Sequence, residues 1–295
     1  MSPSAQGHAA MLLFSALVAG SFSLGGLVAN EIAPLALNVV RFIVAGVAVG
    51  AVAWASGGMR RAALRAPWRY LVLGGLFSVY FVLMFEGLKT APPVSSAAVF
   101  TLVPAMAALV AWPLLGQVTT PRMALALVIG GVGALWVIFR ADLGALMAFE
   151  IGRGEAIFLI GCAAHAIYTP MVRKLNRGES AVVFSFGTLV AGALLMSLVG
   201  WRAIAQTEWA ALRPLVWVTI FYVSLCASAI TFVLVQFATM RLPSAKVMAY
   251  TYLVPTWVIC WEVALGNPAP PALLGVGVGL TVLALVLLLR EDAPN

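Results

Sequence analysis

The run Leu102-Val103-Pro104 recurs as Leu253-Val254-Pro255, 151 residues further along the chain (253 minus 102). At the same spacing, Phe81-Val82-Leu83 recurs as Phe232-Val233-Leu234. Each copy places a proline inside a long apolar segment, where it removes a helix hydrogen bond. A membrane chain that contains two copies of one unit is typical of transporters, whose substrate sites lie between the two halves.

The composition indicates an integral membrane protein. Of the 295 residues, 63% are hydrophobic and 9% are charged, and apolar segments of about 18 residues or more recur along the whole chain. The net charge of +7 comes from basic residues in short connections between these segments, which is the pattern of membrane topology signals. We therefore expect the lipid bilayer as a partner and no nucleic acid. The three cysteines lack metal-ligand spacing, so no metal or cofactor is expected.

Ten apolar segments separated by proline and glycine turns are predicted to cross the bilayer as helices. The first is too long for a signal-peptide core and follows no Lys or Arg, so we expect it to remain as a helix. The segments cover roughly residues 9–28, 35–55, 68–88, 94–115, 122–139, 156–173, 181–200, 215–239, 245–265 and 271–289.

The basic residues predict the orientation of these helices. Alternate connections hold eleven Lys and Arg residues on one side and five on the other, and the richer side is cytoplasmic by the positive-inside rule. Both termini are therefore predicted to be cytoplasmic. The richer set comprises Arg60, Arg61, Arg65, Arg69, Arg122, Arg173, Lys174, Arg177, Arg241, Lys246 and Arg290.

The repeat predicts the fold class: an all-α integral membrane protein with ten transmembrane helices in two inverted five-helix repeats. Each repeat has an odd number of crossings, so the second copy enters the membrane from the opposite side. We expect the repeats to comprise residues 1–145 and 146–295 and to form one integrated membrane domain.

Four short features of the spans point to a family: Arg41-Phe42 in the second span, the run Gly87-Leu88-Lys89-Thr90-Ala91 ending the third, and the segments around Pro104 and Pro255. In these features the chain resembles the drug/metabolite transporter superfamily of the EamA type. The resemblance implies ten helices in two inverted repeats and transport of small metabolites across a bacterial inner membrane. The chain is also similar to bacterial exporters of aromatic amino acids, which implies amino acid export.

Polar and aromatic residues inside the spans are the candidates for substrate binding. Ser228 and Thr231 lie on one stripe of the eighth helix, and the repeat aligns Thr231 with Tyr80 and Tyr252 with Thr101. The alternatives are interhelical hydrogen bonds and core packing, and the stripe through Trp257 is an alternative face of the ninth helix. The predicted substrate-binding residues are Tyr80, Thr101, His165, Tyr168, Ser228, Thr231, Tyr252 and Thr256.

Charged residues near the predicted external ends are the candidates for a gate. Arg41 lies about two turns inside its helix, and Glu86, Lys89 and Glu262 fall near helix ends. Charges at such depth are costly unless they are paired, so we expect a polar cluster that closes one gate, with interfacial snorkelling as the alternative. Pro104 and Pro255 are predicted as hinges of this movement, or else as static kinks.

The sequence predicts transport rather than catalysis. Its two histidines, His8 and His165, lie far apart, and no nucleophile, metal or paired-carboxylate motif accompanies them. An apolar, aromatic cavity with hydroxyl groups suits a neutral or zwitterionic amphipathic solute. Because the spans 9–28 and 156–173 contain no Asp or Glu, we expect a facilitator; a proton-coupled exporter, and less so a membrane enzyme or subunit, are the alternatives. The oligomeric state stays open.

Overall fold

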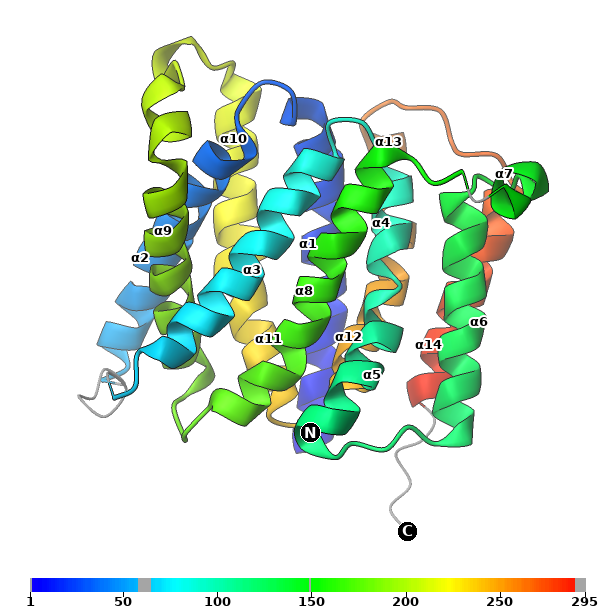
Figure 1. The fold of residues 1–295 in the computed structure, drawn as a ribbon, viewed down its shortest axis with the longest axis horizontal. Helices are drawn as coiled ribbons and strands as arrows, with labels where there is room; N and C mark the ends of the chain where they lie inside the picture. Colours follow the sequence, from blue (N-terminus) through cyan, green and yellow to red (C-terminus); the bar gives the residue numbers. More distant parts are fainter. Residues whose placement is uncertain (1, 58–64, 149, 290–295) are drawn as a thin grey trace.

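The computed structural model describes residues 2–57, 65–148 and 150–289, and every regular element in these ranges is a helix. Figure 1 shows long helices that run side by side between two faces of the molecule. We call the lower face, where α1 begins and α14 ends, the terminal face, and the upper one the distal face. Three residues of the predicted topology signal, Arg60, Arg61 and Arg290, lie outside the described ranges.

Nine of the described helical segments are long and apolar enough to cross a membrane, and α14 is a shorter tenth. The ten-helix architecture predicted from the sequence is therefore confirmed. The spanning segments are α1 (Pro3–Val28), α2 (Pro34–Ala55), α3 (Trp68–Gly87), α4 with α5 (Pro93–Phe100, Val103–Leu115), α6 (Pro121–Ile138), α8 (Arg153–Leu175), α9 (Ala181–Gln206), α10 with η3 and α11 (Pro214–Ser224, Leu225–Ile230, Thr231–Thr239), α12 with η4 and α13 (Ser244–Ala249, Tyr250–Leu253, Val254–Ala264), and α14 (Leu274–Leu289); short helices α7 (Leu143–Met147) and η2 (Trp209–Ala211) lie between spans.

Local sequence signals set the ends of these helices. Proline occupies the first helical position of α2, α6 and α10, where its missing N–H needs no partner. Thr120 caps α6 by accepting a hydrogen bond from the backbone N–H of Met123. Gly116 ends α5 in the left-handed conformation, at φ 64°, which glycine adopts without a steric penalty.

The two repeats are inverted and interlocked. α1 begins at the terminal face, whereas α8, the first helix of the second repeat, begins at the distal face (Figure 1). The third helix of each repeat packs on the first two of the other: α3 packs on α8 and α9, and the α10–α11 helix packs on α1 and α2. The fifth helices, α6 and α14, pack together at one edge of the bundle. The centre is therefore lined by both repeats.

Both fourth helices are interrupted part-way along their length. Thr101 and Leu102 separate α4 from α5, and the 3₁₀ turn η4 separates α12 from α13. Pro104 and Pro255 follow directly, each as the second residue of the continuing helix. The third helices differ from one another, because η3 is a π-helical segment whereas α3 is an uninterrupted α-helix.

Candidate substrate site and gates

A small enclosed cavity lies at the centre of the bundle. It is bordered by α1, α3, α8 and α11, and thus by both repeats. Its volume is about 10 Å³, room for roughly one water molecule. In this conformation the cavity is therefore too small to hold a metabolite. Its lining residues are Phe14, Val18, Phe77, Tyr80, Phe81, His165, Thr231, Phe232 and Val235.

The cavity wall is a cluster of aromatic rings centred on Phe77. The Phe77 ring centroid lies 3.8 Å from that of Tyr168, 4.3 Å from that of Phe232 and 5.1 Å from that of His165. The rings of Tyr80 and His165 lie 4.6 Å apart. Since α3 of the first repeat and α8 and α11 of the second each contribute rings, widening of the cavity would separate ring contacts that join the two repeats.

Three polar atoms in this wall lack partners. The Tyr80 hydroxyl and both ring nitrogens of His165 are buried and make no hydrogen bond among the described residues. Buried polar atoms without partners carry a free-energy cost of about 1–3 kcal/mol each. Such groups are available to a small ligand once the cavity opens.

Arg41 lies next to the cavity with its guanidinium group at the π-helical segment η3. Its side chain is 0% exposed, Nη2 donates to the carbonyl of Ala227 at 2.9 Å, and Nε donates to Ser228 Oγ at 2.5 Å. Its Cζ lies 3.6 Å from the centroid of the Phe81 ring, which lines the cavity. Nη1 has no partner, and within the described ranges no carboxylate forms a salt bridge with Arg41.

The structure brings five of the eight predicted substrate-binding residues together. Tyr80, His165 and Thr231 line the cavity. Tyr168 packs behind Phe77, where its hydroxyl accepts a hydrogen bond from Gln236 at 3.0 Å. Ser228 holds Arg41.

The other three residues, Thr101, Tyr252 and Thr256, do not line the cavity. The Tyr252 ring lies against Gly130 of α6, where an added Cβ would come within 2.4 Å of it, and Thr101 donates to its own helix at Ala98. Trp257 also stays outside the cavity: it is 37% exposed and donates to Ser15 of α1 at 3.2 Å. The four-residue 3₁₀ turn η4 explains why Tyr252 does not lie on the face expected for a continuous α-helix. Each residue of a 3₁₀ turn rotates about 20° further around the helix axis than a residue of an α-helix.

The predicted external cluster of Arg41, Glu86, Lys89 and Glu262 does not form. Glu86 pairs with Lys89 on its own turn at 2.7 Å, and Glu262 accepts from Asn267 at 2.8 Å. Arg41 contacts neither, because its long side chain extends from α2 to the middle of the neighbouring helix at η3. Its partners are neutral groups rather than carboxylates.

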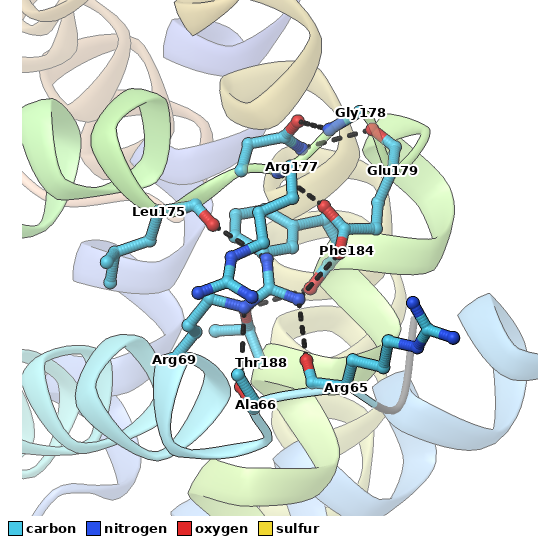
Figure 2. A network of polar contacts seen from close by, with 10 residues as sticks. Arg65, Ala66, Arg69, Leu175, Arg177, Gly178, Glu179, Phe184 and Thr188 are labelled. Atoms are coloured by element: carbon cyan, nitrogen blue, oxygen red, sulfur yellow. Dashed lines mark hydrogen bonds and ion pairs between the residues drawn. The ribbon is translucent and has the colours of Figure 1, made fainter. Parts of the chain in front are cut away.

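A buried ion pair lies at the terminal face instead (Figure 2). Arg69 at the start of α3 donates to Glu179 at 2.6 Å and to the carbonyl of Leu175 at 2.7 Å. The side chains are 1% and 9% exposed, and the pair joins α3 to the α8–α9 connection of the other repeat. Partial burial raises the pKa of Glu179, but hydrogen bonds from Arg69 and the Arg177 backbone N–H outweigh it and hold the pKa below its usual value.

A second ion pair occupies the related position at the distal face. Arg213, just before α10, forms two hydrogen bonds with Glu31 in the α1–α2 connection. This pair is more exposed, 62% for Arg213 and 28% for Glu31, and the hydrogen bond from Arg213 lowers the pKa of Glu31. We call these two pairs the terminal latch and the distal latch. Sequence reasoning missed both as pairs; the available signal was one acidic residue in the first connection of each repeat.

One buried acidic residue was also missed. α8 begins at Arg153 rather than near residue 156, so the helix includes Glu155 in its first turn. Glu155 is buried and accepts a hydrogen bond from Ser95 of α4 at 2.7 Å. The expectation that the sixth span contains no acidic residue is therefore wrong, although Glu155 lies outside the central cavity.

Comparisons with known proteins agree with this architecture. The model of the EamA-like transporter family matches the chain twice, over residues 5–139 and 152–290. An uncharacterized transporter of Bacillus subtilis (strain 168), YyaM, is 23% identical over 261 residues, which cover 88% of this chain and 85% of the relative. A solved crystal structure with 24% sequence identity has the same fold, with a TM-score of 0.73 and 99% of each chain covered.

Proposed function

Because the chain belongs to the EamA-like transporter family, we propose that it exports amino acids, aromatic ones included, across a bacterial cytoplasmic membrane by alternating access. The observation that carries this proposal is the central cavity, whose wall combines stacked aromatic rings with the unpartnered hydroxyl of Tyr80 and imidazole of His165. Aromatic surface with a few convergent polar groups suits a small amphipathic solute. Alternating access is supported by the latches, which join the two repeats at opposite faces.

Counterflow into liposomes that contain only the purified protein tests the substrate class. We expect labelled phenylalanine, tyrosine and tryptophan to accumulate in vesicles preloaded with the same amino acid, and a labelled sugar phosphate to stay outside. Phe77→Ala should lower this uptake, since Phe77 is the centre of the cavity wall. The matched control is Phe237→Ala. Phe237 lies on α11, which like α3 borders the cavity, but its own side chain does not line the cavity. Absence of amino acid counterflow from folded protein would refute the proposal.

The proposed orientation places both termini in the cytoplasm, so the terminal face is cytoplasmic. Its support is the distribution of Lys and Arg among the connections. A cysteine at Ser2, in a background without the three native cysteines, should react with an impermeant reagent only from the cytoplasmic side. The other terminal label, at Asn295, lies outside the described residues. Labelling of either position from outside would refute this orientation.

We propose facilitated transport without proton coupling. Glu155, the buried acid of α8, sits in the first turn of its helix beside Ser95 and does not border the cavity, so substrate and proton would not compete for one site. An imposed pH difference, without a substrate gradient, should therefore drive no net uptake into liposomes. Uptake that Glu155→Gln abolishes would instead establish the alternative, a proton-coupled exporter.

A further inference from the structure

The guanidinium group of Arg41 is a buried positive charge whose contacts are all neutral. Two of its five N–H groups donate to Ser228 and Ala227, and its face stacks on Phe81. A buried charge is costly unless a counter-ion or a full set of hydrogen bonds compensates it. Within the described ranges Arg41 has no carboxylate partner, and Nη1 donates to nothing.

A purely structural role explains only part of this arrangement. Arg41 joins α2 to the π-helical segment η3 and so ties the two repeats together. A neutral side chain with two donors would make the same bonds without burying a charge or leaving a donor unpaired. The remaining donor and the uncompensated charge point to an anionic ligand that is present for part of the transport cycle.

The position of Phe81 connects this charge to the central cavity. One ring both stacks on the guanidinium, at 3.6 Å, and lines the cavity beside Tyr80 and His165. Displacement of the Phe81 ring when the cavity opens would expose the guanidinium to the same space as the unpartnered Tyr80 hydroxyl. The Arg41 guanidinium, the Tyr80 hydroxyl and the His165 imidazole, which can all donate hydrogen bonds to an oxyanion, would then face one aromatic cavity.

We propose that Arg41 binds the carboxylate of the transported solute, while the rings of Phe77 and Phe232 hold its apolar part. This assignment rests on the proposed function, because it places the solute in the central cavity. A guanidinium pairs with a carboxylate through two parallel hydrogen bonds, and one positive charge balances one carboxylate. A phosphate ester carries more charge than this single cation would neutralise. The ligand class is therefore an aromatic or apolar monocarboxylate, of which amino acids are one kind.

Matched acids and amides test the inference on the purified full-length protein. The pairs are phenylalanine with phenylalaninamide, and indole-3-acetate with indole-3-acetamide, with affinity measured by thermal stabilisation and by competition. The wild-type protein should bind each acid about tenfold or more tightly than its amide, as expected for hydrogen bonds between charged partners. Equal affinity within both pairs, or binding of none of the four compounds, would overturn the inference without any variant.

Variants then assign the preference to Arg41. Arg41→Met should reduce the acid preference to about onefold, and Arg41→Lys should keep part of it, since lysine keeps the charge but not the planar fork. Arg202→Met, which removes an exposed arginine on α9, is the control and should keep the full preference. An unchanged preference in folded Arg41→Lys and Arg41→Met would overturn the inference.

These outcomes separate the inference from the proposed function. Counterflow of amino acids together with equal binding of acids and amides would leave the proposed function standing and remove Arg41 as the carboxylate site. Arg41-dependent binding of indole-3-acetate without any amino acid counterflow would keep the carboxylate site and refute amino acid export.

Discussion

Replacement of Glu179 by glutamine tests whether the terminal latch holds one gate closed. The substitution keeps the size of the side chain but removes the charge that faces Arg69, whose side chain is 1% exposed. Arg69 would keep its bonds to the carbonyls of Leu175, Ala66 and Arg65, so its guanidinium would remain hydrogen-bonded but without a counter-ion. We expect the terminal face to open more often.

The magnitude follows from the burial of the pair. Hydrogen bonds that involve a charged group contribute about 1.5–3 kcal/mol, and removal of one partner from a fully buried pair costs about 3–5 kcal/mol. Because Glu179 lies at the edge of the protein, 9% exposed, and Arg69 keeps three carbonyl acceptors, we expect a loss of about 2 kcal/mol. Loss of about 2 kcal/mol would shift the equilibrium about 30-fold from the closed toward the open terminal face.

Thiol labelling from the terminal-face side measures this shift. Thr231, which lines the cavity, is replaced by cysteine in a background without the native cysteines, and the rate of reaction with an impermeant reagent is compared with and without Glu179→Gln. The rate should rise up to about 30-fold. Glu31→Gln, at the more exposed distal latch, is the matched control and should not raise labelling from this side. Equal labelling with and without Glu179→Gln would refute the argument that the terminal latch is a gate.

Three further outcomes follow from the site and the helix breaks. Tyr80→Phe should slow transport, because it removes an unpartnered hydroxyl from the cavity wall, whereas Tyr252→Phe should leave the counterflow rate unchanged; a slowed Tyr252→Phe would move the substrate toward α6. Pro104→Ala and Pro255→Ala should each lower the transport rate severalfold, because alanine supplies the N–H that would let the helix continue across the break and stiffen it; unchanged rates would make these prolines static kinks. The pKa of Glu179 is lowered on folding, so its contribution to stability is present above its ordinary pKa of 4.5 and is lost as the pH falls through the folded value. The difference in unfolding midpoint between wild type and Glu179→Gln should therefore be constant from pH 8 to 5.5 and shrink only below about pH 4.5.

The fold was largely predictable because its signals are local or repeated. Apolar segment length identifies a membrane span without any knowledge of its neighbours, and the proline pair aligns the two copies. The breaks next to Pro104 and Pro255 fall where this alignment predicts irregular backbone. The start of α8 was placed three residues late, because the charged residues Arg153 and Glu155 interrupt the apolar pattern that marks a span.

The site was less predictable because it depends on how each helix is rotated. Tyr252 and Trp257 lie on different faces of an ideal α-helix, and the 3₁₀ turn η4 decides which face meets α1. The residue pattern predicts a break before Pro255 but not its 3₁₀ geometry, and nothing in the pattern marks the π-helical segment η3. The two latches join residues 110 and 182 positions apart, so they depend on packing between repeats rather than on spacing along the chain.

The interlocked packing of the third helices has a consequence for how the chain is made. When α3 emerges during synthesis, the helices on which it packs, α8 and α9, have not yet been translated. The first half therefore enters the membrane as helices that satisfy their own backbone hydrogen bonds but lack the interfaces that complete their core. The first half can complete its packing only after the second half has been inserted, because the third helix of each half packs on helices of the other half.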